Sequence, residues 1–170
     1  MMTLWRRGGF AEDSWTFVAD DAPAPAEGPI VVSLRRWLAE GESLAARKAP
    51  VGVAVEAGAD AQAHLAELAG RPLVALAFAK FADGRAFSYA RLLRDRYRFK
   101  GELRAVGDVL IDEIPLMLRC GFTAFEVNNA PTIRALEAGS LPRPAIHYQP
   151  ASIPGEVHAG ERPWLRVSAG

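Results

Sequence analysis

The chain has 170 residues, with 20 basic and 20 acidic side chains and therefore no formal net charge. This length and composition are typical of one globular domain. The longest apolar runs, such as residues 73–79, are far shorter than the roughly 18 residues that a membrane helix needs, so no membrane partner is expected. Zero net charge gives no general attraction for nucleic acid, and no nucleic-acid partner is expected either.

The one cysteine, Cys120, cannot form an internal disulfide, and no apolar stretch of signal-peptide length follows the basic N-terminus. The expected localisation is therefore cytoplasmic. Cys120 is expected to be an inert packed residue at a helix end. The three histidines are far apart and show no metal-ligand spacing, so no metal site is predicted.

Residues 1–28 predict an N-terminal β-hairpin and a linker. Short β-prone runs cover residues 4–7 and 14–18, and residues 20–28 are rich in proline, alanine and acidic side chains. We expect the hairpin to pack as a small lid on the edge of the main sheet through its aromatic residues.

Residues 29–149 predict a single α/β domain. Short β-prone runs alternate with helical patterns, and most of the runs are continuously apolar, which favours parallel strands covered on both faces. The expected architecture is repeated βα units around a mainly parallel sheet, partly like a TIM barrel; an open doubly wound sheet is the alternative. The predicted strands are residues 30–34, 51–56, 73–78, 103–106, 124–127 and 145–148.

Several polar residues are placed to begin helices. Asp60, Ser88 and Asp108 are the expected N-caps of three helices, and a further, shorter helix is expected to begin at Asn129 or Ala130. Pro115 lies inside the helical pattern that follows Asp108, where it should kink the helix or delay its start. Residues 150–170 lose periodicity and gather proline and glycine, which predicts an extended C-terminal tail.

Although the net charge is zero, the basic and acidic side chains are unevenly distributed along the chain. Residues 80–104 contain eight basic and three acidic side chains, a local charge of +5, which leaves −5 on the rest of the chain. Guanidinium groups bind oxyanions through paired hydrogen bonds, and helix N-termini add N–H donors. A small anion is therefore the ligand that this segment favours.

Candidate site residues follow two of the predicted strands. Because ligands of parallel α/β folds bind at the carboxyl ends of the strands, Lys80, Arg85 and Arg104 are candidates for anion binding. Asp83 and Asp108 are the candidate catalytic acid or base residues of the same region. The alternatives are that Asp83 belongs to a turn and that Asp108 only caps a helix.

Three further arginines recur on one side of the helix predicted after Ser88, namely Arg91, Arg94 and Arg98. They are expected to face solvent or an acidic partner. Arg91 can also pair with Asp95 one helical turn later.

Three runs carry a family resemblance: FAKFADGRAFSYARLLR at 78–94, FKGELRAVGDVLID at 99–112 and RCGFTAF at 119–125. They closely resemble the domain-of-unknown-function 934 family of bacterial proteins. Members are commonly labelled oxidoreductases of sulfite reduction, because their genes lie beside those of assimilatory sulfite reductase. The C-terminal tail and Pro115 depart from the family pattern.

The resemblance implies an accessory protein or oxidoreductase of assimilatory sulfite reduction, with sulfite reductase or another sulfur-assimilation protein as a partner. The known reductases use a sirohaem coupled to an iron–sulfur cluster, and a cubane cluster is typically held by four cysteines where this chain has one. The chain is therefore not expected to be the catalytic subunit, and its cofactor stays unknown.

Whether the chain is an enzyme stays open at this point. One alternative is a small-molecule enzyme that acts on an anionic substrate at the strand ends. The other is a scaffold that docks an acidic partner through its arginine-rich helix.

Overall fold

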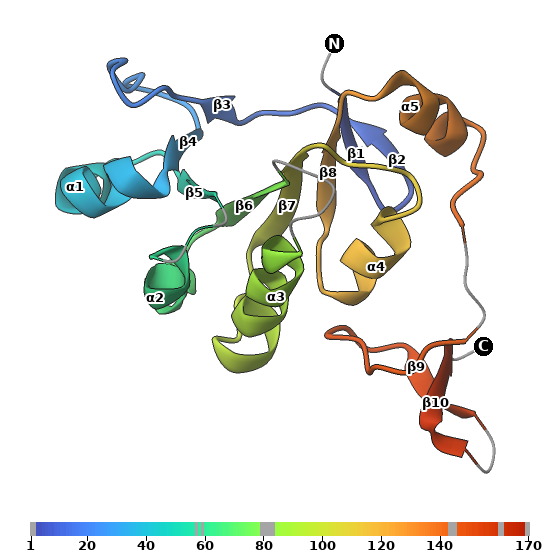
Figure 1. Ribbon diagram of the computed structural model, residues 1–170. Helices are drawn as coiled ribbons and strands as arrows, with labels where there is room; N and C mark the ends of the chain where they lie inside the picture. The colour runs from blue at the N-terminus through green and yellow to red at the C-terminus, as the bar shows by residue number, and fades with distance from the viewer. Residues whose placement is uncertain are drawn as a thin grey trace.

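Eight strands form one curled sheet, a half-barrel, in the order β2-β1-β8-β7-β6-β5-β4-β3 (Figure 1). The computed structural model describes residues 3–56, 58, 60–78, 84–142, 146–159 and 162–168. The predicted α/β fold, with a mainly parallel and partly TIM-barrel-like sheet, is confirmed. In chain order the strands are β1 (Thr3–Arg6), β2 (Gly9–Ala11), β3 (Thr16–Phe17), β4 (Ile30–Ser33), β5 (Val51–Val55), β6 (Leu73–Phe78), β7 (Glu102–Gly107) and β8 (Ala124–Val127).

The sheet is parallel from β3 to β8, and β1 and β2 add an antiparallel pair at one edge. Helical segments connect β4 to β8, so each crossover returns the chain to the same end of the sheet. β6 is buried along nearly its whole length. This double coverage explains why its sequence is continuously apolar instead of alternating.

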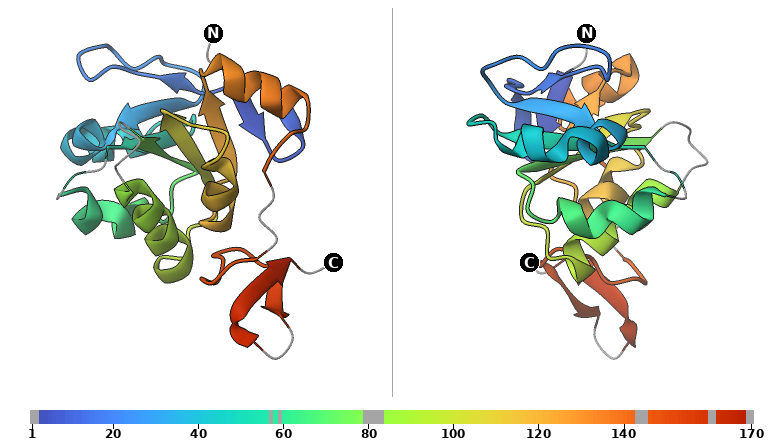
Figure 2. Two further views of the ribbon diagram at one scale, coloured as in Figure 1. Left: turned by 45° about the vertical axis from the view of Figure 1, so that its right-hand side comes forward. Right: turned by 90° about the vertical axis from the view of Figure 1, so that its left-hand side faces the viewer.

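The crossover helices cover one face of the sheet (Figure 2). The main hydrophobic core lies between that face and these helices, and we call the opposite face of the sheet the inner face. No helix in the described ranges is long and apolar enough to cross a bilayer. The helices are α1 (Leu34–Ala45), α2 (Ala61–His64), the 3-10 segment η1 (Leu65–Leu68), α3 (Arg85–Arg91), the π-helical segment η2 (Leu92–Arg96), α4 (Ile114–Arg119) and α5 (Ala130–Glu137).

The helix starts agree with the predictions in part. α5 begins at Ala130, one of the two expected starts, and Asn129 caps it through its side-chain oxygen, whereas Asp60 occupies the N-cap position of α2 without a side-chain hydrogen bond. Ser88 and Asp108 are not caps: Ser88 lies inside α3, and α4 begins well after Asp108, beside Pro115. Proline lacks an N–H group, so the first turn of a helix is the place that tolerates it.

The N-terminal segment spans the whole sheet. β1 pairs with β2 in a hairpin and with β8, and the chain then crosses the inner face to β3, which pairs with β4 at the far edge (Figure 1). The predicted hairpin is confirmed, but its second strand is β2, and the run at 14–18 joins the other edge. On the way Trp15 packs against Val31, Leu73 and Ala75 of the inner face.

One ion-pair network fastens this crossing segment to the sheet. Arg104 Nη1 and Nη2 donate to the Asp13 carboxylate at 2.7 and 3.0 Å, and Arg104 Nε donates to Glu102 Oε1 at 2.9 Å. The Arg104 side chain is 0% exposed, against 30% for Asp13 and 19% for Glu102. Glu102 also accepts from Arg6 of β1 at 2.8 Å. The network therefore ties β7, β1 and the crossing segment together.

The C-terminal residues form a separate hairpin, where an extended tail was expected. β9 (Glu156–Ala159) and β10 (Arg162–Ser168) pair antiparallel near the C-terminus of the chain (Figure 2). The strand predicted at 145–148 is wrong for its described part: only His147 pairs, through an isolated bridge to Arg166 of β10. Whether residues 146–148 form a strand depends on a pairing partner elsewhere in the chain, and local composition does not identify that partner.

Removing Asp13 should loosen the crossing segment. In Asp13→Ala the buried Arg104 loses one of its two carboxylate partners, and truncation of one member of a buried pair costs about 3 kcal/mol of unfolding free energy. Chemical denaturation measures this loss. The double variant Asp13→Ala/Arg104→Met should recover much of it, because the buried guanidinium is gone and Glu102 keeps its pair with Arg6; an equal loss in the double variant would contradict the ion-pair explanation.

Candidate functional site

The predicted strand-end site is described only in part. Lys80 and Asp83 lie outside the described residues. Arg85 is the first residue of α3, and Asp108 is exposed just after β7, where its N–H donates to the Phe78 carbonyl at 2.9 Å. The assignment of Lys80, Asp83, Arg85 and Asp108 to a substrate site stays a prediction.

Arg104 does not lie at a strand end. Its strand position faces the inner side of the half-barrel, opposite Ala75 on β6 and Ala124 on β8. Its donors face Asp13 and Glu102, so the protein's own carboxylates occupy the place that was predicted for an external anion. This corrects the expectation for Arg104, and the reason is simple: a buried guanidinium needs anionic partners, and they are already present.

The Arg104–Asp13 pair also controls the ionisation of its members. Burial opposes the charge on both groups, yet the hydrogen bonds between them outweigh it: the pKa of Asp13 lies below its ordinary value and the pKa of Arg104 above its own. Both side chains therefore stay ionised at neutral pH. A pair of this kind positions other groups and is poorly suited to proton transfer.

Glu126 is a candidate acid or base that sequence reasoning missed. It lies on β8 opposite Leu4 of β1, and its neighbours Phe125 and Val127 belong to the core on the helix side, so Glu126 faces the inner side. Burial raises its pKa; Arg104 lowers it and Asp13 raises it further. A half-buried carboxyl with a raised pKa beside an ion pair is a candidate functional group. The one signal in the sequence that could have identified Glu126 is an acidic residue between two apolar residues of a predicted strand.

Of the three arginines expected to face a partner, Arg94 points back into the protein. Arg94 Nε donates to the Gly121 carbonyl at 2.9 Å, and Nη1 donates to the carbonyls of Phe99 and Gly101 at 2.7 and 3.1 Å. Burial lowers its pKa. Arg94 therefore holds together the loops before β7 and β8, so the expectation of a partner-facing role is wrong for this residue. A long side chain on a helix surface can fold back to satisfy carbonyls, which helical spacing does not predict.

Arg91 binds the protein's own C-terminal segment. Its Nη2 donates to the Pro150 carbonyl at 2.9 Å, and its Nε lies 3.9 Å from Asp95, the pair that the sequence predicts. Asp95 accepts from Ser152 Oγ at 3.0 Å. Arg98 is exposed, as expected. The surface that was predicted for an acidic partner thus carries residues 150–152 of the same chain.

Arg119 completes this docking. It pairs with Glu156 of β9 and donates to the Gln149 carbonyl, while its own carbonyl accepts from Ser152 N–H at 2.7 Å. The Glu156 pKa is lowered, chiefly by the hydrogen bond from Arg119. These contacts hold the base of the β9–β10 hairpin against α4.

The docked hairpin carries much of the exposed apolar surface. The described residues include seven exposed large hydrophobic side chains, and four of them lie in or beside this hairpin: Ile146 (55%), Tyr148 (75%), Val157 (48%) and Trp164 (61%). Such a concentration on an appended element is typical of a protein-binding surface. The many prolines and glycines of residues 150–170 led to the prediction of an extended tail, so this hairpin surface was not predicted.

Cys120 is buried, and burial raises the pKa of its thiol, with Arg91 and Arg119 opposing that shift. Its packing among core residues agrees with the expected inert role. In the ranges that the structure describes, no group of histidine, cysteine and acidic side chains could hold a metal ion.

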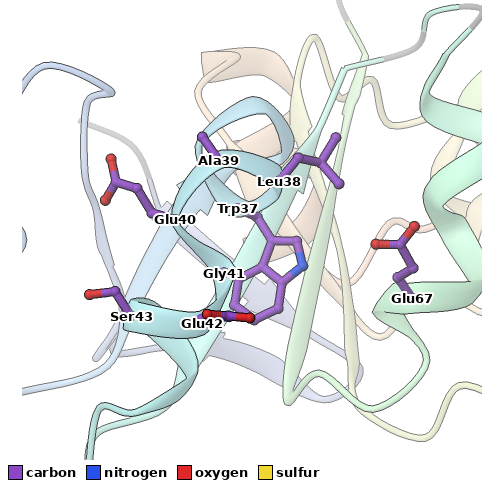
Figure 3. A pocket seen from close by; sticks show the side chains of 8 residues that line it. All are labelled: Trp37, Leu38, Ala39, Glu40, Gly41, Glu42, Ser43 and Glu67. Atoms are coloured by element: carbon purple, nitrogen blue, oxygen red, sulfur yellow. The ribbon is translucent and has the colours of Figure 1, made fainter.

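A hollow between α1 and η1 lies on the helical side of the sheet and is lined by eight residues, among them Trp37, Glu42 and Glu67 (Figure 3). The Arg71 guanidinium lies over the Trp37 ring, 4.5 Å from its centroid. Glu67 pairs with His64 at 2.9 Å. These contacts are those of a seam between two helices, and we assign no ligand to it.

The raised pKa of the half-buried Glu126 carboxyl predicts that this residue affects stability differently at different pH values. A glutamate whose folded pKa is raised destabilises the fold at neutral pH, and this cost vanishes below the ordinary glutamate pKa of about 4.3, where both states are protonated. Glu126→Gln should therefore raise the melting temperature at pH 7 and make no difference at acidic pH. Glu137→Gln on the exposed surface of α5 is the control and should leave the melting temperature unchanged at both values.

The docking of the C-terminal hairpin depends on Arg119. In Arg119→Ala chymotrypsin should cut after Tyr148 and Trp164 several-fold faster, because the Glu156 pair and the Gln149 contact are lost, while the unfolding midpoint of the domain moves little. The wild-type hairpin should also loosen as the pH falls through the lowered pKa of Glu156. An unchanged cleavage rate in Arg119→Ala would show that other contacts hold the hairpin.

Comparison with known proteins gives one match. No curated protein and no solved structure matches the chain significantly. A family model described as "Bacterial protein of unknown function (DUF934)" matches residues 52–156. The match runs from β5 to the first residue of β9 and includes the arginine-bearing helix and the docked segment. The chain belongs to this family.

Proposed function

We propose that this chain is an accessory protein of assimilatory sulfite reduction that works by binding another protein through its β9–β10 hairpin. The observation that carries the proposal is the exposure of Ile146, Tyr148, Val157 and Trp164 around this hairpin. Aromatic residues of this kind dominate the binding energy of protein interfaces. The pathway comes from the family resemblance, and the mode of action from the surface.

The way the hairpin is held favours a binding role. The Arg119–Glu156 pair and the bonds from Arg91 and Ser152 fix residues 150–156 against α3, η2 and α4. A binding element that is already ordered loses less conformational entropy when a partner docks. A protein of this design recruits or orients its partner and leaves the reduction itself to the partner.

The alternatives have less support from the described residues. A scaffold that docks an acidic partner through Arg91 and Arg94 conflicts with the bonds that both side chains make within the chain. An enzyme acting on an anionic substrate loses Arg104 as one of its three clamps. Glu126 remains a candidate for a catalytic acid or base, and its substitution tests that role.

The decisive experiment is co-purification with sulfite reductase. Trp164→Ser and Tyr148→Ser together should reduce the recovered reductase at least about tenfold, since two exposed aromatic anchors are removed. Leu38→Ser is the matched control: Leu38 is 45% exposed on α1, away from the hairpin, and its loss should change nothing. In a deletion strain, the double variant should fail to restore growth on sulfate, and Glu126→Gln should restore it.

Two outcomes would contradict the proposal. Normal growth of the deletion strain on sulfate, with no association of the two proteins, would remove the link to sulfite reduction. Full association of the hairpin variant would move the contact surface elsewhere on the chain.

A further inference from the structure

A basic groove lies at the amino-terminal end of β7, away from the predicted strand-end site. Its volume is about 320 Å³, and it lies between the end of η2, the loop before β8 and the docked C-terminal segment. Its charged and hydroxyl-bearing walls come from Arg94, Asp95, Arg98, Lys100, Thr123 and Ser152. Three of these side chains are cationic and one is anionic.

Arg98 occupies an unusual backbone conformation at the mouth of this groove. Its φ is +56°, and among the described residues it alone of the non-glycine residues has a positive φ. Arg98 follows the end of η2, where the Phe99 N–H turns back to the Leu93 carbonyl at 2.9 Å. Glycine is the usual residue at this left-handed position, because a side chain there is strained. A strained residue at a position that glycine would satisfy suggests that the side chain itself is required.

The other charges of the groove are already engaged, which leaves two cations. Arg94 binds three carbonyls, and Asp95 accepts from Ser152 and lies beside Arg91. Arg98 and Lys100 are exposed, and neither has a hydrogen-bond or ion-pair partner within the described part of the chain. Through the carbonyls of Phe99 and Gly101, Arg94 thus fixes the loop that presents Arg98 and Lys100.

We infer that this groove binds the oxyanion group of a small molecule, such as a sulfate or phosphate, between Arg98 and Lys100. A guanidinium and an ammonium two residues apart in the loop between η2 and β7 match an oxyanion, because both form charge-assisted hydrogen bonds to its oxygens. Ser152 and Ile153 form one wall of the groove, whose volume of about 320 Å³ suits a small ligand. The groove shares this wall with the segment that holds the hairpin, but the inference does not rest on the proposed function.

Titration calorimetry of the full chain with sodium sulfate and sodium phosphate, at constant ionic strength set by sodium chloride, tests the inference. Arg98→Gly should weaken the binding of both anions about tenfold, the loss expected for one charge-assisted contact. Without sulfate or phosphate, the same variant should melt about 2 °C higher, because glycine relieves the left-handed strain. Loss of binding together with a gain of stability distinguishes a ligand contact from a structural role.

Arg96→Gln is the matched control, since Arg96 is an exposed arginine two residues away that does not line the groove. Its affinity for sulfate should stay within about twofold of wild type, as for loss of a distant surface charge. An equal loss in Arg96→Gln, or no preference for sulfate and phosphate over chloride, would overturn the inference. Lys100→Gln provides a second test and should lose affinity as Arg98→Gly does; undiminished binding in either variant would also overturn it.

Discussion

The charge of Arg104 is the constraint on which the rest of the half-barrel depends. A guanidinium that is fully buried on the inner face of the sheet is stable only with anionic partners around it. Asp13 comes from the far end of the chain, and Glu102 comes from the same strand and is shared with Arg6. The N-terminal segment therefore has to lie across the inner face, and Trp15 fills the space that its crossing creates.

The strands of the parallel core could be predicted because local residues determine them. Continuously apolar runs indicate doubly covered strands, and Asn129 before a proline-bearing helix indicates a helix start. Arg104 was misassigned for the opposite reason: its partner Asp13 is 91 positions away, and no local pattern joins them. Arg94 was misassigned because helical spacing gives the position of a side chain on a helix and says nothing about where its end turns.

The docked C-terminal segment connects the two surfaces to which we assign binding. Residues 149–156 hold the exposed aromatic hairpin in place, and Ser152 and Ile153 within them also form one wall of the basic groove. A ligand in the groove would contact the segment that supports the hairpin. The physical requirement for coupling between the two sites, a shared element, is therefore present.

The crossing N-terminal segment has a consequence for the way the chain folds. β1 pairs with β8, so β1 has no partner on one side until residues 124–127 have been synthesised. Contacts between residues so distant in sequence close late and slow folding. Until then the hairpin has an open edge, and the glycine reversal at Gly8 and Gly9, both at positive φ, keeps that edge short. The half-barrel can form its parallel core first, and the N-terminal strands then complete it.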